Sequence, residues 1–404
     1  MRIVHLVDLF SPSIGGTERV VQDLALAQAF AGETVTVITL TPAGSVEVDL
    51  PGVTVLRLEL GRLGRLGIAD PTRPFHPPFP LWHVTGELRK ALAALDADVI
   101  IAHSWIVYSY LPLREELGIP VVWYLHDFLL SCPKRTKLYE PGGPCPGASI
   151  RRCVSCSTSQ YGVVKASVVT VGQRLANSRL LERVDHILAN SASVASVGAA
   201  DLSFTAPLTV VGAPVALSES RIGARKRPEF LPDGDYVLFV GQLSRQKGLY
   251  ELLEVFSALD GSDVGLVCIG TRQPSTPTQW PPKTTIAEDV SHEDVLAAFE
   301  YCRFGVLPSH AEGLGLVALE AAGLGRAMIV SDVGGLTEVV ENDVTGIVVP
   351  VGETLLLSAA MQRLLDDPEL ARTMGLAGRQ RAGAMADTAV AGRIREVLEG
   401  LLRT

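Results

Sequence analysis

Two glutamates in the second half of the chain, Glu312 and Glu320, stand eight residues apart in a glycine-containing stretch. Eight helical residues make about two turns, or roughly 12 Å. This separation resembles the distance between the sugar and the ribose of a nucleoside diphosphate sugar, and a helix N-terminus between the acids would face the diphosphate. The glycines and apolar neighbours favour such a site over a surface helix with two solvated acids.

Two cations lie near the start of the same half of the chain. Arg245 and Lys247 follow the apolar run 235–240 and precede Gly248. Positive charge held beside developing negative charge stabilises a transition state, so the pair suits a leaving diphosphate. Loop cations that are merely solvated are the alternative.

Further polar residues directly follow short apolar runs. In open parallel sheets, ligands bind beyond the carboxyl ends of the strands, so these positions are candidates for a site. They are His103, the pair His126 and Asp127, the segment 309–312, and the loop 13–17. In that loop, Gly15 and Gly16 allow backbone N–H groups to approach an anion, although paired glycines often serve turn geometry alone.

The apolar runs alternate with amphipathic segments, which is the βαβ pattern of parallel sheets buried on both faces. Pro-rich residues 215–234 separate two such series, so we expect an α/β chain of two doubly wound, Rossmann-like domains facing a central cleft, 1–215 and 216–385, with a helix in 386–404 that packs back on the first domain. The expected strands are 2–7, 34–40, 53–58, 98–102, 119–125, 186–189, 208–211, 235–240, 264–269, 304–307, 327–330 and 346–349.

Composition excludes several classes of protein. The 404 residues carry a formal net charge of -9, which argues against a protein that wraps nucleic acid. The opening MRIVHLVDLF contains Asp8 and lacks a cleavage site, so it predicts a buried strand rather than a signal peptide. No stretch is apolar enough to span a bilayer, and the expected location is cytoplasmic.

The stretch that starts at Phe304, FGVLPSHAEGLGLVALEAAGLGRAMIVSDVGGLTEVVENDVTGIVV, resembles the retaining family-4 glycosyltransferases of the GT-B fold. It matches their E-x7-E motif and the GG-x-x-E-V-V segment that follows. The resemblance extends to the GG-x-x-R-V loop at Gly15, the pair at His126, and the G-x-L-x-x-x-K-G stretch at Gly241. It covers essentially the whole chain.

The resemblance implies transfer of a sugar from a nucleoside diphosphate sugar, with a UDP-sugar favoured, to an acceptor hydroxyl. The anomeric configuration is retained by front-face displacement, a donor phosphate oxygen takes the acceptor proton, and no cofactor or DxD-bound metal is required. DxD strings at 96–98 and 233–235 precede strands and fit turns better.

The implied roles fall on matching positions. Glu312 would contact the transferred sugar, Glu320 the ribose, and Arg245 with Lys247 the diphosphate, while His126 would lie beside the reacting sugar. The acceptor side would include His103 and Asp127. The donor-binding set is Gly16, which could also serve the acceptor side, Gly241, Ile286, Gly313, Leu314, Gly315, Leu316, Val317 and Glu320.

The chain departs from the family pattern in two places. Gln242 stands where the family usually has arginine, and the helix expected after Gly270 is replaced by the Pro-rich stretch TRQPSTPTQWPPK. That stretch borders the expected nucleobase pocket near Ile286. The departures motivate one alternative to the transferase, a catalytically silent nucleotide-sugar-binding partner protein. A sugar-nucleotide epimerase on the same fold is a further alternative.

Four of the six cysteines gather in one Pro/Gly-rich excursion: Cys132, Cys145, Cys153 and Cys156. Four thiols in a reducing compartment suggest a structural zinc site, while free thiols or a disulfide are the alternative. Basic residues dominate the excursion, which fits an anionic acceptor or a solvated loop. With Arg57, Arg62, Arg65 and Arg73, they also raise weak peripheral membrane contact as a hypothesis.

Overall fold

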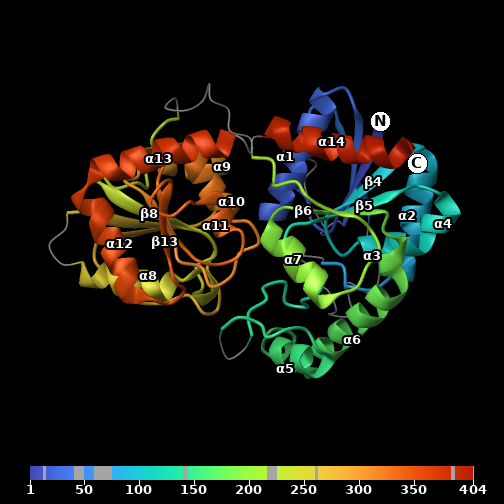
Figure 1. Ribbon diagram of the computed structural model, residues 1–404, viewed down its shortest axis with the longest axis horizontal. Coiled ribbons are helices and arrows are strands. Elements are labelled where there is room, and N and C mark those ends of the chain that lie inside the picture. Colours follow the sequence, from blue (N-terminus) through green and yellow to red (C-terminus); the bar gives the residue numbers. More distant parts are fainter. Residues whose placement is uncertain are drawn as a thin grey trace. The chain divides into compact units, whose positions relative to one another are not determined.

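The chain forms two compact units in the computed structural model, which describes residues 1–11, 15–40, 50–58, 75–139, 143–215, 225–259, 263–383 and 387–403. Unit 1 comprises Met1–Pro214 and Asp387–Thr404, and unit 2 comprises Val215–Ala386. The chain therefore leaves unit 1, completes unit 2, and returns to unit 1 with its last helix (Figure 1).

Unit 1 contains a sheet of seven parallel strands in the order β3-β2-β1-β4-β5-β6-β7. The order reverses at β1, which is the hallmark of a doubly wound sheet. The strands are β1 (Arg2–Val7), β2 (Thr34–Leu40), β3 (Val53–Leu58), β4 (Val99–Ala102), β5 (Val121–Leu125), β6 (His186–Ala189) and β7 (Leu208–Val210).

The helices of unit 1 connect these strands and cover the sheet. The longest helix, α6, lies beside α5, and α14 packs on α1. Their bounds are α1 (Gly16–Phe30), α2 (Trp82–Leu95), α3 (Val107–Tyr110), α4 (Arg114–Leu117), α5 (Ile150–Tyr161), α6 (Val163–Leu180), α7 (Ala192–Asp201) and α14 (Asp387–Arg403).

Unit 2 repeats the architecture with six parallel strands in the order β10-β9-β8-β11-β12-β13. Its strands are β8 (Tyr236–Val240), β9 (Gly265–Ile269), β10 (Thr284–Ala287), β11 (Gly305–Leu307), β12 (Met328–Ser331) and β13 (Gly346–Val349). Its helices are the 3-10 turn η5 (Arg245–Lys247), α8 (Leu249–Ala258), α9 (His292–Tyr301), α10 (Leu316–Gly323), α11 (Leu336–Val339), α12 (Thr354–Asp366) and α13 (Pro368–Gly383).

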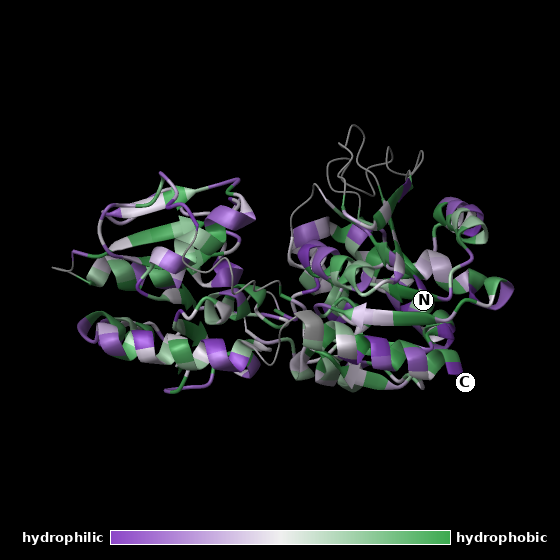
Figure 2. Cartoon of the chain, turned by 90° about the horizontal axis from the view of Figure 1, so that it is seen from above, coloured by the Kyte–Doolittle hydropathy of each residue, from purple (hydrophilic) through white to green (hydrophobic). Residues whose placement is uncertain are grey.

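The central strands are hydrophobic along their length because helices cover both faces, whereas the helices alternate hydrophobic and hydrophilic residues (Figure 2). Every residue of β4 and of β5 is buried. The prediction of two Rossmann-like α/β domains is confirmed by the two sheets.

One strand, β10, was absent from the sequence expectations. It pairs in parallel with β9 at the edge of the second sheet, with Ile286 opposite Cys268. Only four residues long, TTIA, it follows the Pro-rich stretch and lacks a long apolar run. These properties hid it from a search for buried strands.

The last helix is fixed to unit 1 by apolar and polar contacts. Val390, Ile394 and Leu398 of α14 are fully buried. Arg393 donates two hydrogen bonds to the carbonyl of Val211, at 2.7 and 3.1 Å. The helix is therefore part of the core of unit 1, although unit 2 precedes it in the chain.

Close packing in unit 2 makes Gly375 on α13 a test of the fold. A Cβ atom there would lie 2.1 Å from the carbonyl oxygen of Gly325, whereas a Cβ at Gly392 on α14 would meet nothing within 4 Å. We expect Gly375→Ala to destabilise the protein by about 1–3 kcal/mol because backbone must shift. Gly392→Ala should be neutral or stabilise it by up to about 1 kcal/mol, because alanine favours a helix interior.

Denaturant unfolding of both variants measures this difference. Equal stability of Gly375→Ala and the parent chain would show that α13 is not packed against the backbone of Gly325 as described.

Candidate active site

The candidate catalytic cation and carboxylate of unit 2 are joined directly. Lys247, at the end of η5 after β8, places Nζ 2.5 Å from Oε1 of Glu312. Ser309, which follows β11, donates a hydrogen bond from Oγ to the same oxygen at 3.1 Å. Both members of the ion pair are largely shielded from solvent, with side-chain exposures of 20% and 13%. The structure thus brings together two residues that lie 65 positions apart.

Glycines allow the loop of Glu312 to lie against its neighbours. A Cβ on Gly334, whose φ is +54°, would lie 1.8 Å from the carbonyl oxygen of Glu312. The N–H of Gly335 donates to the carbonyl of Gly313 at 3.0 Å. The Gly334–Gly335 pair therefore allows close packing against the loop that carries Glu312. This packing explains the two glycines of the GG-x-x-E-V-V segment.

The two glutamates do not share one helix, contrary to the geometry assumed from their spacing. Gly315 has φ +89°, and a Cβ there would lie 2.4 Å from Leu336, so the left-handed turn delays the helix to Leu316. Glu312 therefore lies in the preceding loop. Glu320 lies in the second turn of α10, where it is 7% exposed, with Nε2 of His292 3.7 Å from its Oε1.

The N-terminus of α10 lies directly after this loop. The first N–H groups of a helix have no intrahelical acceptor, and they attract anions. They belong to the segment that contains Leu316 and Val317, with Gly313 and Leu314 just before it. A phosphate group could accept hydrogen bonds from these amides between Glu312 and Glu320.

The remaining donor-side candidates surround the carboxyl ends of β8 and β9. Arg245 is exposed and holds its guanidinium 4.3 Å from the ring centroid of Tyr250. Gly270 has φ +156°, and a Cβ there would lie 1.8 Å from the carbonyl oxygen of Gly241. Gln242 is exposed beside them, and Ile286 is half-buried in β10.

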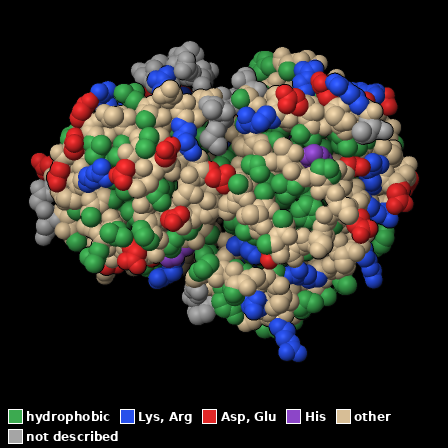
Figure 3. Space-filling view, viewed as in Figure 1, with side chains coloured by type: hydrophobic (Ala, Val, Ile, Leu, Met, Phe, Trp, Pro, Cys, Tyr) green, Lys and Arg blue, Asp and Glu red, His purple; other side chains and the backbone are tan. Residues whose placement is uncertain are grey.

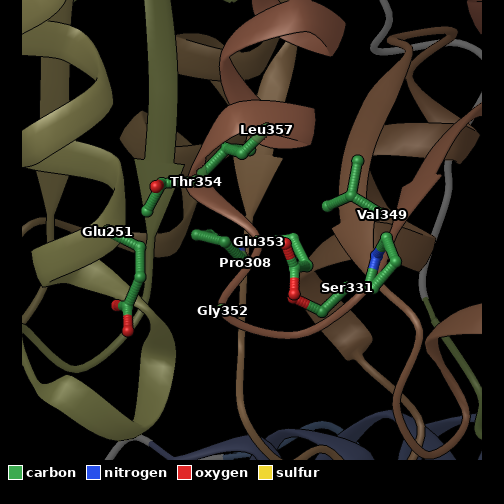
Figure 4. A pocket seen from close by; sticks show the side chains of 9 residues that line it. Glu251, Pro308, Ser331, Val349, Gly352, Glu353, Thr354 and Leu357 are labelled. Atoms are coloured by element: carbon green, nitrogen blue, oxygen red, sulfur yellow. The ribbon is translucent and has the colours of Figure 1, made fainter.

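A small pocket lies at the carboxyl ends of β11, β12 and β13 (Figure 4). It is lined by residues that include Glu251, Ser331 and Glu353, and its volume of about 10 Å³ leaves room for about one water molecule. Ligand pockets for drug-sized molecules are larger, about 300–1,000 Å³. Glu251 Oε1 binds Nε2 of His310 at 2.9 Å, which connects this pocket to the loop of Glu312.

In unit 1, three histidines form a hydrogen-bonded chain. Nδ1 of His5 lies 2.8 Å from Nε2 of His103, and Nδ1 of His103 lies 2.9 Å from Nε2 of His126. The far end of the chain is fixed by Gln28 of α1, whose Oε1 lies 2.7 Å from Nε2 of His5. Both pairs of rings are stacked with centroids 5.1 Å apart.

The direction of this chain follows from its first link. Because an amide oxygen only accepts, Nε2 of His5 must carry a proton and, in a neutral ring, Nδ1 must accept. The same alternation passes to His103 and then to His126. Nδ1 of His126 is left as an acceptor, buried and without a hydrogen-bond partner among the described residues. The chain thus presents a lone pair suited to a donor such as a hydroxyl group.

Burial keeps these rings neutral. It lowers the pKa of His5 to about 4 and that of His126 to about 3, and His103 is lowered strongly by burial and by both neighbouring rings. His76 has a pKa of about 4 for the same reason. All four imidazole rings are uncharged at neutral pH.

Sequence reasoning missed Asp8 and His5. Asp8 follows β1, so the rule that selected His103 would also have selected it. Its Oδ1 accepts hydrogen bonds from Ser104 Oγ and from the N–H of Ile106, both at 2.8 Å. Burial raises the pKa of Asp8 to about 6. His5 lies inside a buried strand, where an apolar residue is the usual choice.

The other candidates of unit 1 have internal partners. Asp127 accepts hydrogen bonds from Arg135 at 2.6 and 2.9 Å and from the N–H of Leu129 at 2.7 Å. Gly16 opens α1, and a Cβ on Gly15 would lie 2.1 Å from the carboxylate of Glu18. A carboxylate therefore already lies near the amide end of this helix. Residues 13 and 14 of the loop lie outside the described residues.

The predicted zinc site is not supported. All six cysteines are free, and within the described ranges no three His, Cys, Asp or Glu residues are grouped so that they could hold a metal ion. Cys132 packs against the core of unit 1, while Cys153 and Cys156 lie on α5. The thiol of Cys156 donates to the carbonyl of Leu138 at 3.4 Å.

The two parallel doubly wound sheets give the chain the GT-B fold, and the family models identify it as a nucleotide-sugar glycosyltransferase. The family model "Glycosyltransferase Family 4" matches residues 14–219, and "Glycosyl transferases group 1" matches residues 221–381. The chain belongs to glycosyltransferase family 4, whose members are retaining hexosyltransferases.

Similar proteins cover nearly the whole chain. Glycogen synthase of Mycobacterium tuberculosis (strain ATCC 25618 / H37Rv) is 27% identical over 94% of this chain and 90% of that protein. The structure of sucrose-phosphate synthase from Thermosynechococcus elongatus matches with a TM-score of 0.77 and 21% identity, over all of both chains. The structure of Anabaena Alr3699/HepE in complex with UDP-glucose matches with a TM-score of 0.69 and 17% identity, over 99% and 100%.

The buried histidines predict a loss of stability in acid. Their folded pKa values lie below the unfolded value near 6.5, so the unfolded chain binds more protons as the pH falls from 6.5 towards 4. We expect each buried histidine to lower the free energy of unfolding by about 1–2 kcal/mol between pH 7 and pH 5. Protonation of Asp8 in the folded state offsets about 1 kcal/mol of this total loss. Denaturant unfolding at both pH values measures the net loss.

Histidine side-chain NMR provides the matching control. The rings of His5, His76, His103 and His126 should all be neutral at pH 6, because burial lowers the pKa of each. Imidazolium signals from His5, His103 or His126 at pH 6 would contradict the proposed direction of the hydrogen bonds between these rings.

Proposed function

We propose that the protein transfers a hexosyl group from a UDP-sugar to an acceptor hydroxyl, with retention of the anomeric configuration and without a metal-bound donor. The contact between Lys247 and Glu312, next to the N-terminus of α10, carries the proposal. It places a cation and a carboxylate beside amides that bind phosphate. These three groups correspond to the leaving diphosphate and the transferred sugar.

In this proposal, the two turns of α10 bind different parts of the donor. The amides of its first turn and Lys247 bind the diphosphate, and Arg245 approaches it from the η5 loop. Glu320, buried in the second turn, accepts hydrogen bonds from the ribose hydroxyls. Glu312, freed from Lys247 by the arriving phosphate, accepts hydrogen bonds from the sugar.

A UDP-sugar is favoured over other donors by the similar proteins. The Anabaena Alr3699/HepE structure contains UDP-glucose. The short β10 strand and the Pro-rich stretch before it stand where the family pattern has a helix beside the expected base pocket.

The proposed reaction is a front-face displacement. The bond between the anomeric carbon and the diphosphate oxygen breaks, and its electron pair leaves with UDP. The acceptor oxygen bonds to the anomeric carbon on the same face, and its proton passes to a phosphate oxygen of the departing UDP. Lys247 and the amides of α10 stabilise the growing negative charge, so the protein supplies electrostatic stabilisation.

Unit 1 contributes an acceptor atom to the proposal. Nδ1 of His126 points its lone pair away from the histidine chain, and a sugar hydroxyl is a suitable donor. His103 then acts as a positioning residue because it fixes the tautomer of His126. Asp127 orders Arg135 in the same loop.

The nucleotide preference is tested by thermal shift with UDP, GDP, ADP and TDP. We expect UDP to give the largest stabilisation, about 2.7 kcal/mol at 100 times its dissociation constant. A larger effect of GDP or ADP would reassign the donor. No effect of any nucleotide, while UDP-glucose still stabilises, would show that binding requires the sugar.

The catalytic assignment is tested by Glu312→Gln and Lys247→Ala. Loss of positioned charge beside the leaving group should lower turnover by about 100-fold to 1,000-fold. The matched controls are Glu229→Gln and Lys226→Ala, whose side chains in unit 2 are 94% and 89% exposed. UDP release from UDP-glucose in the presence of a hexose panel provides the rate.

Two results would overturn the proposal. Unchanged turnover in both active-site variants would remove Lys247 and Glu312 from the chemistry. Isomerisation of the donor without acceptor would indicate an epimerase, and proton NMR of the product distinguishes retention from inversion at the anomeric carbon.

A further inference from the structure

Helix α6 of unit 1 exposes an apolar stripe. Val164, Val168, Val171 and Leu175 recur every three or four residues and so lie on one face of the helix. Their exposures are 79%, 49%, 39% and 51%. Scattered exposed apolar residues are ordinary, but a continuous row on one helix face is a typical feature of an interaction surface.

The opposite face of α6 is already used by the core. Ala166, Val169, Gln173 and Ala176 are buried there, and Gln173 donates to the carbonyl of Leu129 at 2.7 Å. The helix therefore cannot bury the stripe by rotating. The exposed apolar row therefore needs an apolar environment outside the unit.

Every charged residue of α5 and α6 is a cation. Residues 141–181 contain no Asp or Glu. They contain five cations, two at the start of α5 and three on α6: Arg151, Arg152, Lys165, Arg174 and Arg179. By helical spacing, Lys165 and Arg179 lie on one side of the stripe and Arg174 on the other.

The two helices lie together at the border of unit 1 (Figure 1). In the space-filling view, this part of unit 1 shows basic and hydrophobic side chains close to one another (Figure 3). Apolar residues flanked by cations are the combination that binds a bilayer with anionic headgroups, because the apolar side chains enter the interface and the cations remain at the phosphates.

A second copy of the chain is the other occupant to consider. The spacing of the stripe resembles the apolar seam of a coiled coil. However, paired α6 helices would bring only cations to the flanks of that seam, because no acid lies within residues 141–181 to pair with them. Like charges disfavour this association, whereas anionic lipid satisfies both the stripe and its flanks.

We propose that α6, with α5 beside it, docks the protein reversibly on the surface of an anionic lipid bilayer. This surface lies on different elements from the residues assigned to sugar transfer. No helix among the described residues is long and apolar enough to cross a membrane. The proposed contact is at the bilayer surface, and its strength depends on ionic strength.

Vesicle flotation tests this proposal with the full chain. We expect binding to phosphatidylcholine vesicles that contain phosphatidylglycerol, and weak binding to phosphatidylcholine alone. The double variant V168E/L175E should lower the bound fraction by about tenfold or more, because it places carboxylates in the apolar stripe. The control is Leu355→Glu, since Leu355 is an 83% exposed apolar residue on α12 of unit 2.

A milder variant addresses folding. V164S/V168S/V171S/L175S removes the apolar stripe without adding charge, and its unfolding midpoint should remain close to that of the parent chain because the side chains are exposed. Its loss of vesicle binding supports the proposal.

Three outcomes would overturn the proposal: no vesicle binding by the parent chain, equal binding to neutral and anionic vesicles, or dimerisation in sedimentation velocity that V168E/L175E abolishes. The last would assign the stripe to a second copy. Nucleotide binding is measured separately without lipid, so failure of lipid docking is distinguishable from failure of the proposed function.

Discussion

The spacing of neighbouring parallel strands determines how the three hydrogen-bonded histidines of unit 1 are arranged. Adjacent strands lie about 4.8 Å apart, and the stacked imidazoles of His5, His103 and His126 repeat at 5.1 Å. Each ring comes from the next strand along the sheet, β1, β4 and β5. The hydrogen-bonded histidines therefore form a row that crosses the neighbouring strands of the sheet.

Strand register explains why the three rings meet. His5 is paired with Ile101, so His103 lies two residues beyond it on the same face. Ala102 is paired with Trp123, which places His103 level with Tyr124 and His126 again two residues further on. A shift of one residue in either pairing would send one ring to the other face and leave buried polar atoms without partners.

Unit 2 reaches its site by different means. Its polar groups lie in loops, where strand register does not control them, and glycines determine how closely the loops approach. Gly315, Gly334 and Gly270 each occupy left-handed or tightly packed backbone that a side chain would disturb. The electrostatic pairing of Lys247 with Glu312 then holds two of those loops together.

These two mechanisms explain what the sequence could predict. Strand ends are marked by a change from apolar to polar residues, so His103 and His126 were identifiable, and the parallel sheets followed from the runs themselves. His5 lies within a strand, so no change from apolar to polar residues identified it. The helix of Glu320 starts later than the eight-residue spacing implied, because Gly315 adopts a left-handed conformation and the helix begins only at Leu316. The cysteines were close in sequence, but distance along the sequence does not determine whether their thiols converge on one point in the fold.

The return of α14 to unit 1 has a consequence for biosynthesis. A ribosome releases the chain from its N-terminus, and Val390, Ile394 and Leu398 belong to the core of the unit that emerges first. That unit lacks one of its covering helices until all of unit 2 has been translated. The apolar surface of α1 that α14 covers is exposed during this interval, when it is available to chaperones or to neighbouring nascent chains.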